Sequence, residues 1–361
     1  MVIQTNHDWE RIAWRVVQPQ QIVLVIGSVD VGKSTFCRFL VEQGISRGLK
    51  VGLVDADVGQ SQIGPPTTIG LKFFGLNELE AEQNGNVEGV RQNGILEADD
   101  FYFVGWISPE RHMLQCLTGT RLMVDAALDT GVDFLVIDTT GYIDGMPAIV
   151  LKQQKIELIK PNHLICIHRS RELDAIVSCF DNLDCLHLHR LSPHKAVTSK
   201  SSEFRRKYRE SGFDCYFSNS VVETLPFDQI RGQRTPFFIG RQANAKELDF
   251  ISNLVQDRAL YAEWGHRSLT LVALDVLPSF AKARLKSHLS LINLFTETPA
   301  HFEGRLIGLL NVEGKMLSIG IVEGVDFQAS QLQIRCRAGV ARDARIIQFG
   351  HYQANWKNER Q

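Results

Sequence analysis

The sequence predicts an α/β fold with a mainly parallel sheet and helices on both faces, followed by a small, mainly β domain. Short β-branched runs alternate with helical patterns through the first half of the chain, which is typical of parallel strands with helical crossovers. A glycine-rich turn at 27–32 directly follows the first of these runs. After residue 236 the pattern changes to short, tightly alternating apolar runs. We therefore expect a short extension (1–20), a main domain (21–235) and a C-terminal domain (236–361).

The elements of the main domain can be placed in chain order. An apolar run at 22–26 predicts the first strand, and the spacing of Phe36, Phe39 and Leu40 predicts a helix over 34–46. Further runs predict a helix at 113–128 and strands at 51–54, 101–104, 134–137, 164–167 and 185–188. Residues 73–100 are rich in Asn, Glu and Gly and carry the turn signals Asn84-Gly85 and Asn93-Gly94, so we expect a surface excursion there.

The C-terminal domain begins with an amphipathic stretch at 247–261. Alternating apolar and polar residues follow in three runs, at 306–310, 316–322 and 332–337, and glycine-containing turns divide these runs. Such runs are typical of strands with one buried face. They predict a small antiparallel β module.

Composition limits the class of protein. Of the 361 residues, 44% are hydrophobic and 22% are charged, which suffices for a packed core, and the formal net charge of −2 gives no global signal of a nucleic-acid partner. Seven cysteines form no C-x-x-C pair, as expected of reduced thiols. The first fifteen residues lack the apolar stretch of a signal peptide, and no later run could span a bilayer. We therefore expect a cytoplasmic protein without a membrane partner.

The glycine-rich turn has the spacing of a phosphate-binding loop. Residues 27–34 read GSVDVGKS and fill every fixed position of G-x-x-x-x-G-K-[ST]. The N–H groups of such a turn bind nucleotide phosphates, its lysine reaches the β- and γ-phosphates, and its serine binds Mg²⁺. The motif predicts a P-loop NTPase with a nucleoside triphosphate and Mg²⁺ as ligands. The candidate binding residues are Gly27, Asp30, Val31, Gly32, Lys33, Ser34 and Thr35.

Acidic residues follow two of the predicted strands, at the sheet edge where ligands of open α/β folds bind. Asp55 and Asp57 come after the second strand, with Gly59-Gln60 behind them, and Asp138 ends a later strand. A carboxylate there can hold magnesium through water or accept a proton from an attacking hydroxyl. Alternatively, these side chains cap the turns that follow the strands. On the first interpretation Ser34, Asp57 and Asp138 form the metal site.

The most basic segment of the chain runs from His194 to Arg209 and interleaves aromatic residues with arginines. It follows the last apolar run of the main domain, where phosphotransferases often carry a mobile lid that brings arginines over the transferred group. A lid near 192–210 and the solvated face of a helix both fit this pattern. The histidines form no metal-binding motif, so we interpret the following as strand-end and surface residues: His163, His168, His187, His189 and His194.

Four motifs in one order carry a resemblance. They are GSVDVGKST at 27–35, DADVGQSQIGPPTTIG at 55–70, DTTGY at 138–142 and SPHKAVTSKSSEFRR at 192–206. With these motifs the chain resembles the polynucleotide 5′-hydroxyl kinases, a family that includes the kinase subunit of the pre-mRNA cleavage factor and the nucleolar ribosomal-RNA processing kinases. Residues 306–327 also look like the small β domain of compact prokaryotic members. Residues 1–20 stand where the eukaryotic relatives have a long N-terminal domain.

The resemblance implies roles for residues that would contact the nucleic acid. Asp57 matches the general base that takes the proton of the 5′-hydroxyl, and Gln60 matches a residue that orders the substrate or the water shell of magnesium. Thr139, Gly141 and Tyr142 match a clasp that grips the end of the strand, with Tyr142 where many relatives have Trp. An aromatic ring there can stack on a base of a single strand.

The resemblance also implies a lid and a reaction. Arg205 matches the second lid arginine, and Lys200 stands at the position of the first, where lysine keeps the charge but loses the planar fork of arginine. The implied reaction is in-line transfer of the γ-phosphoryl group of ATP to the 5′-hydroxyl end of single-stranded RNA or DNA, as in nucleic-acid repair or RNA processing. Two alternatives stay open: an inactive ATP-binding scaffold, and a dimeric partition-type ATPase that needs no acceptor.

Overall fold

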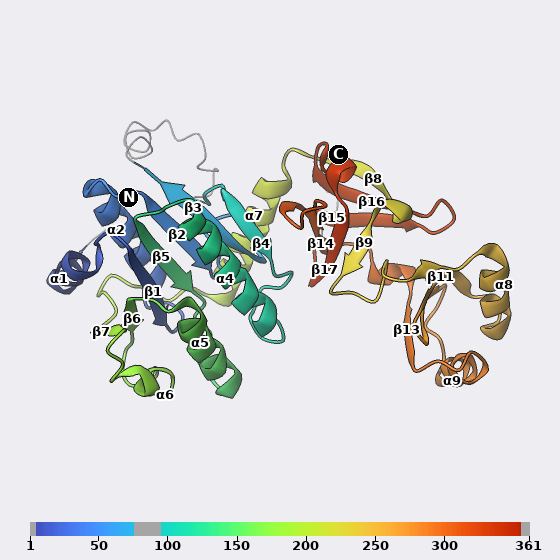
Figure 1. Ribbon diagram of the computed structural model, residues 1–361, viewed down its shortest axis with the longest axis horizontal. Coiled ribbons are helices and arrows are strands. Elements are labelled where there is room, and N and C mark those ends of the chain that lie inside the picture. Colours follow the sequence, from blue (N-terminus) through green and yellow to red (C-terminus); the bar gives the residue numbers. More distant parts are fainter. Residues whose placement is uncertain (1–4, 76–94, 355–361) are drawn as a thin grey trace. The chain divides into compact units, whose positions relative to one another are not determined.

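The chain folds into two compact units, residues 1–216 and 217–361 (Figure 1). The computed structural model describes residues 5–75 and 95–354. The turn signals Asn84-Gly85 and Asn93-Gly94 lie outside the described residues. Within these ranges no helix combines the length and the apolarity that crossing a membrane requires, and the seven cysteines are all free thiols.

A seven-stranded sheet forms the centre of the first unit. Its order is β4-β3-β2-β5-β1-β6-β7. The five strands from β2 to β7 run parallel, whereas β3 and β4 are antiparallel additions at one edge. The predicted mainly parallel sheet is confirmed, and β3 is a strand that the sequence did not predict. The bounds are β1 Gln21–Gly27, β2 Val51–Ala56, β3 Thr68–Phe74, β4 Asp100–Phe103, β5 Phe134–Thr139, β6 His163–Ile167 and β7 His187–Leu191.

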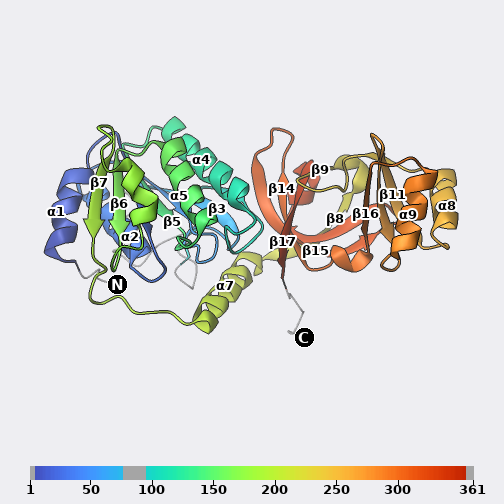
Figure 2. The same ribbon diagram turned by 90° about the horizontal axis from the view of Figure 1, so that it is seen from below.

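Helices cover both faces of this sheet, as predicted (Figures 1 and 2). Helices α1 and α2 pack on one face, and α4 and α5 pack on the other, each with its own apolar core. The residues predicted as an N-terminal extension contribute α1, in which Trp9 is buried with its ring centroid 5.0 Å from that of Phe36. The bounds are α1 His7–Val16, α2 Lys33–Ser46, α4 Met113–Asp129, α5 Met146–Ile159, α6 Asp174–Val177 and α7 Ser202–Phe217.

The second unit contains two sheets. A six-stranded sheet begins at one edge with β8 (Ser220–Pro226) and has the order β8-β16-β15-β14-β17-β9. Strand β9 (Arg231–Gln233) is parallel to β17 (Ile346–Gln353), and all other pairs in this sheet are antiparallel. Its strands β14 (Arg305–Leu310), β15 (Met316–Asp326) and β16 (Gln331–Arg337) match the three predicted runs. A four-stranded sheet has the order β10-β11-β12-β13, and it packs against the helices α8 and α9. Its elements are β10 Arg241–Gln242, β11 Ala259–Gly265, β12 Ser268–Ala273, β13 Asn293–Glu297, α8 Ala245–Leu254 and α9 Ser279–His288.

The division between the units lies at 216/217, earlier in the chain than the predicted boundary at 235/236. Residues 220–226 form β8, which pairs along its whole length with β16, and β9 pairs with β17. These pairings join segments about a hundred residues apart in the sequence, so periodicity alone does not reveal them. The amphipathic stretch predicted at 247–261 covers both α8 and the start of β11.

Candidate active site

The P-loop connects β1 to α2 at the carboxyl edge of the sheet. Gly27 ends β1 so close to its neighbour strand that a Cβ there would lie 2.4 Å from the carbonyl oxygen of Ile167. Gly32 has φ of 91°, a left-handed conformation that favours glycine, and it caps the N-terminus of α2. Val31, within the loop, is fully buried. The side chain of Lys33 is largely buried, and its Nζ donates to the carbonyl oxygen of Ser28 at 2.7 Å.

The acidic residues Asp55 and Asp138 meet beside this loop because β2 and β5 run parallel and in register. Both carboxyls are buried, and the side chain of Ser34 lies beside the Asp138 carboxyl, where it favours the ionised form and so lowers the pKa of Asp138. Burial is the main cause that raises the pKa of Asp55 to about 8, and the nearby charges of Asp138 and Asp57 act in the same direction. Burial also raises the pKa of Asp138, against the opposing effect of Lys33. Asp55 and Asp138 are thus hard oxygen donors whose negative charges repel one another. Such a pair of carboxylates fits a magnesium ion held beside nucleotide phosphates.

Asp57 lies on the loop that leaves β2. Its Oδ1 accepts hydrogen bonds from the backbone N–H groups of Gly59 (3.1 Å) and Gln60 (3.2 Å). Asp55 holds the start of this loop, since its Oδ1 accepts from the backbone N–H of Asp57 (3.0 Å) and its Oδ2 from that of Gln62 (2.5 Å). Among the described residues, the Oδ2 of Asp57 has no hydrogen-bond donor, so this oxygen is available to accept a proton. The buried Oε1 of Gln60 also lacks a partner there.

The basic segment reaches the P-loop through Asp30. One carboxylate oxygen of Asp30 accepts from the guanidinium of Arg205 at 2.5 Å and from the backbone N–H of Lys200 at 3.0 Å. Arg205 lies on α7, and residues 192–201 connect β7 to this helix (Figure 2). The ammonium of Lys200 lies 5.5 Å from the ring centroid of Phe204, on the exposed side of the segment. The predicted lid residues therefore contact the P-loop, but Lys200 does so with its backbone.

The residues predicted to form a clasp occupy the end of β5 and the turn that follows it, and they differ in exposure. Thr139 is fully buried, and its hydroxyl donates to the carbonyl oxygen of Val25 at 2.8 Å. A Cβ on Gly141 would lie 2.5 to 2.8 Å from atoms of Val29, so this turn packs directly against the P-loop. Tyr142 is half-buried. The hydroxyl of Thr139 thus faces the protein interior, and Gly141 and Tyr142 are the members of the motif that lie nearer the surface.

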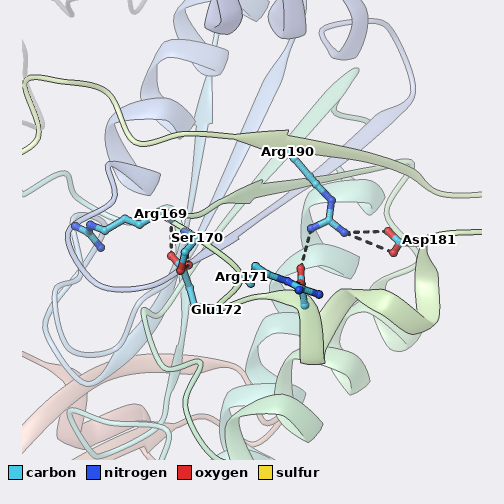
Figure 3. Close-up of polar contacts among 7 residues, drawn as sticks. Arg169, Ser170, Arg171, Glu172, Asp181 and Arg190 are labelled. Carbon is cyan, nitrogen blue, oxygen red and sulfur yellow. Dashed lines mark hydrogen bonds and ion pairs between the residues drawn. The ribbon is translucent and has the colours of Figure 1, made fainter.

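Arg169 is a neighbour of the P-loop that the sequence patterns missed. It follows β6, and its guanidinium donates to the Asp30 carbonyl oxygen (2.5 Å) and to the Ser28 hydroxyl (3.1 Å). Glu172 fixes the turn by accepting from the backbone N–H groups of Arg169 (2.6 Å) and Ser170 (2.7 Å). Figure 3 shows Arg169 and Arg171 pointing to opposite sides of this turn. The position of Arg169 after a predicted parallel strand was the signal that could have found it.

The histidines of β6 and β7 lie together but form no metal site of their own. His163 Nδ1 is 3.1 Å from His189 Nε2, and His187 stacks on His163 with ring centroids 5.2 Å apart. Throughout the described ranges, no group of three or more His, Cys, Asp and Glu side chains is arranged to hold a metal ion. A magnesium ion at Ser34 and Asp138 would therefore depend on the nucleotide and on water for its remaining ligands.

Comparison with known proteins identifies the family of this site. The family model described as the mRNA cleavage and polyadenylation factor CLP1 P-loop matches residues 27–219, more than half of the chain. The chain belongs to the CLP1 P-loop family. The predicted resemblance to the polynucleotide 5′-hydroxyl kinases is thereby confirmed.

Relatives match this CLP1-family chain over most of its length. It is 29% identical over 346 residues to a polyribonucleotide 5′-hydroxyl-kinase of Methanocaldococcus jannaschii, covering 95% of this chain and 89% of the relative. It is 30% identical over 335 residues to a polyribonucleotide 5′-hydroxyl-kinase of Pyrococcus furiosus, covering 91% and 86%. A solved structure of a wild-type Clp1p–Pcf11p complex is 9% identical, with a TM-score of 0.61 over 97% of this chain and 80% of that chain, which supports the fold.

Proposed function

We propose that this CLP1-family protein is an ATP-dependent polynucleotide 5′-hydroxyl kinase. The relatives that match nearly its whole length are named polyribonucleotide 5′-hydroxyl-kinases, so RNA ends are the first acceptors to test. The structural observation that carries the proposal is the 2.5 Å contact between Arg205 of the basic segment and Asp30 of the P-loop. A lid arginine at the phosphate site serves phosphoryl transfer, in which charge must be neutralised and water excluded. It favours a kinase over a scaffold.

The P-loop would bind the triphosphate of ATP. Its backbone N–H groups would bind the phosphates at the N-terminus of α2, and Lys33 would exchange the carbonyl oxygen of Ser28 for a phosphate oxygen. Ser34 and Asp138 would hold magnesium, which neutralises charge on the β- and γ-phosphate oxygens when bound. Thr35, which is exposed on the first turn of α2, would contact the α-phosphate.

The acceptor would be activated by Asp57. The two backbone donors on its Oδ1 orient the carboxylate, and its Oδ2 would take the proton of the 5′-hydroxyl. As the proton leaves, the hydroxyl oxygen bonds to the γ-phosphorus and the bond to the β-phosphate oxygen breaks, releasing ADP. Gln60 would order the acceptor or magnesium-bound water with its unpartnered Oε1. Gly141 and Tyr142 would contact the end of the strand.

The lid would close on the transferred group. In the structure Arg205 is bound to Asp30, so its guanidinium lies at the P-loop. On ATP binding it would stabilise the charge of the γ-phosphoryl group in the transition state. Lys200 would add a second cation, although its side chain must first leave the ring of Phe204.

Transfer of labelled γ-phosphate tests the proposal. Wild-type protein, ATP and Mg²⁺ are incubated with matched single-stranded RNA and DNA oligonucleotides that carry either a 5′-hydroxyl or a 5′-phosphate. We expect label on hydroxyl ends alone and its loss in Lys33→Ala. ATP binding without transfer would instead identify a scaffold, and phosphate release independent of an acceptor would identify an ATPase switch.

A further inference from the structure

Two lysines on α5 are buried inside the first unit. Lys152 and Lys155 are one turn apart on the helix, and their exposed fractions are 1% and 2%. Lysine is almost never fully buried unless it is paired, and α5 otherwise buries aliphatic residues against the sheet and α4. A buried ammonium costs free energy, so a lysine at such a position calls for a specific role.

Lys152 has defined partners in the turn that follows β5. Its Nζ donates to the carbonyl oxygen of Thr140 at 2.6 Å and to the hydroxyl of Thr139 at 2.8 Å. The Thr139 hydroxyl in turn donates to the carbonyl oxygen of Val25. A continuous chain of hydrogen bonds therefore runs from α5 through the end of β5 to β1, the strand that leads into the P-loop.

Lys155 is a natural counterpart to Lys152. It is equally buried and adjacent on the same face of α5, but its Nζ has no hydrogen bond to any residue that the structure describes. The charges of Asp57 and Asp138 act on both lysines. The two side chains thus share burial and the charges of these two aspartates, and only Lys152 makes contacts with Thr139 and Thr140.

The contacts of Lys152 fix the turn that presents the clasp. Residue 140 is held from inside by Lys152, and Gly141 is held from the other side by its close packing on Val29. With both residues fixed, the backbone has little freedom to move before Tyr142, which lies half-buried at the surface. The position of Tyr142 therefore depends on a hydrogen bond formed inside the protein.

We propose that Lys152 is a positioning residue that holds the 139–142 turn in the shape that binds the 5′-hydroxyl end of a nucleic-acid strand. The inference rests on the proposed function, because it assigns Gly141 and Tyr142 to the acceptor. Lys152 itself touches no substrate. It acts through Thr139 and Thr140, so its loss affects the acceptor and leaves the triphosphate contacts of the P-loop intact.

Lys152→Met and Lys155→Met form a matched pair for the test. Methionine keeps most of the aliphatic length and removes one buried amino group in each case. The first substitution also leaves the Thr140 carbonyl oxygen without its donor, whereas the second breaks no hydrogen bond with a described residue. The full-length variants are compared for binding of a 3′-fluorescein-labelled, single-stranded 5′-hydroxyl RNA by anisotropy, for binding of ATP, and for KM and kcat of phosphate transfer.

We expect Lys152→Met to weaken binding of the RNA, and to raise its KM, by about ten- to hundredfold, the scale of a misplaced contact. ATP affinity should stay within about twofold, and Lys155→Met should match the wild type in every readout. Equal RNA binding by the two lysine variants would overturn the inference. If the wild type transfers no phosphate, the proposed function fails, and the RNA-binding comparison still decides the role of Lys152.

Thr139→Val provides a second route if Lys152→Met does not fold. Valine matches threonine in shape but removes the hydroxyl that links Lys152 to Val25. Because this hydroxyl is fully buried, weaker RNA binding by Thr139→Val with unchanged ATP binding supports action through the turn. RNA binding equal to that of the wild type would contradict it.

Discussion

Replacing Asp57 by Asn should separate catalysis from folding. Asn keeps a carbonyl oxygen at Oδ1, so it can still accept from the backbone N–H groups of Gly59 and Gln60. What it loses is the second carboxylate oxygen, which is the proposed proton acceptor. General-base catalysis contributes about 10²- to 10⁴-fold to rates, equal to about 3 to 5 kcal/mol in the activation barrier. We therefore expect kcat to fall by that factor, with ATP affinity unchanged.

Asp55→Asn is the matched control for this prediction. Asp55 accepts from backbone N–H groups on both of its oxygens, including those of Asp57 and Gln62. An amide places an NH₂ group at one of these positions, where it faces another donor, so we expect the free energy of unfolding to fall by about 1–3 kcal/mol. Initial rates at saturating ATP and 5′-hydroxyl RNA, together with urea unfolding, distinguish the variants. A kcat for Asp57→Asn within about threefold of the wild type would refute the assignment of the base.

Three further predictions concern the surroundings of the site. Arg169→Met removes hydrogen bonds to the P-loop and should weaken ATP binding about tenfold, whereas Arg171→Met should not. Equal losses of ATP affinity in the two variants, measured by calorimetry, would contradict this role of Arg169. Gly141→Ala places a Cβ 2.5 Å from Val29 Cγ1, and this overlap should lower the free energy of unfolding by about 1–3 kcal/mol. Urea unfolding and ATP affinity equal to those of the wild type would argue against this close approach. Burial and two neighbouring histidines lower the pKa of His163 from 6.5 to about 4, so the unfolded chain binds more protons between these values. The free energy of unfolding should reach its full value above about pH 6.5 and fall by up to about 3 kcal/mol towards pH 4. In His163→Gln this fall should be smaller, as measured by unfolding across that pH range.

Strands and motifs that depend on local pattern could be predicted from the sequence. The P-loop strand and helix appear where the apolar run and the G-x-x-x-x-G-K-[ST] spacing place them. Strand β3 was missed because it runs from Thr68 into a segment whose composition suggests a loop. The boundary between the units was predicted too late because β8 is stabilised by a partner strand at residues 331–337. Pairing over such distances leaves no local signal.

The contacts of individual site residues depended on the tertiary structure. The resemblance placed Thr139 in the clasp, yet its hydroxyl is bound to Val25 and Lys152 inside the protein. Asp30 is part of the P-loop motif, but its carboxylate binds Arg205 of the basic segment. Arg169 and Lys152 belong to no motif and were missed. In each case the side chain's partner lies on another element, so spacing along the chain could not identify it.

The two aspartates of the D-x-D motif show where spacing stops being informative. Residues two apart on a strand point to the same face, so Asp55 and Asp57 would share an environment if β2 continued. The strand instead ends at Ala56. Asp55 is still in the pleat and points into the interior, where backbone groups occupy both of its oxygens. Asp57 has left the pleat, and its carboxylate is oriented by the turn with one oxygen available. On the proposed assignment, the end of β2 leaves Asp57 rather than Asp55 able to act as the base. The loss of stability expected of Asp55→Asn and the loss of kcat expected of Asp57→Asn both follow from the residue at which this strand ends.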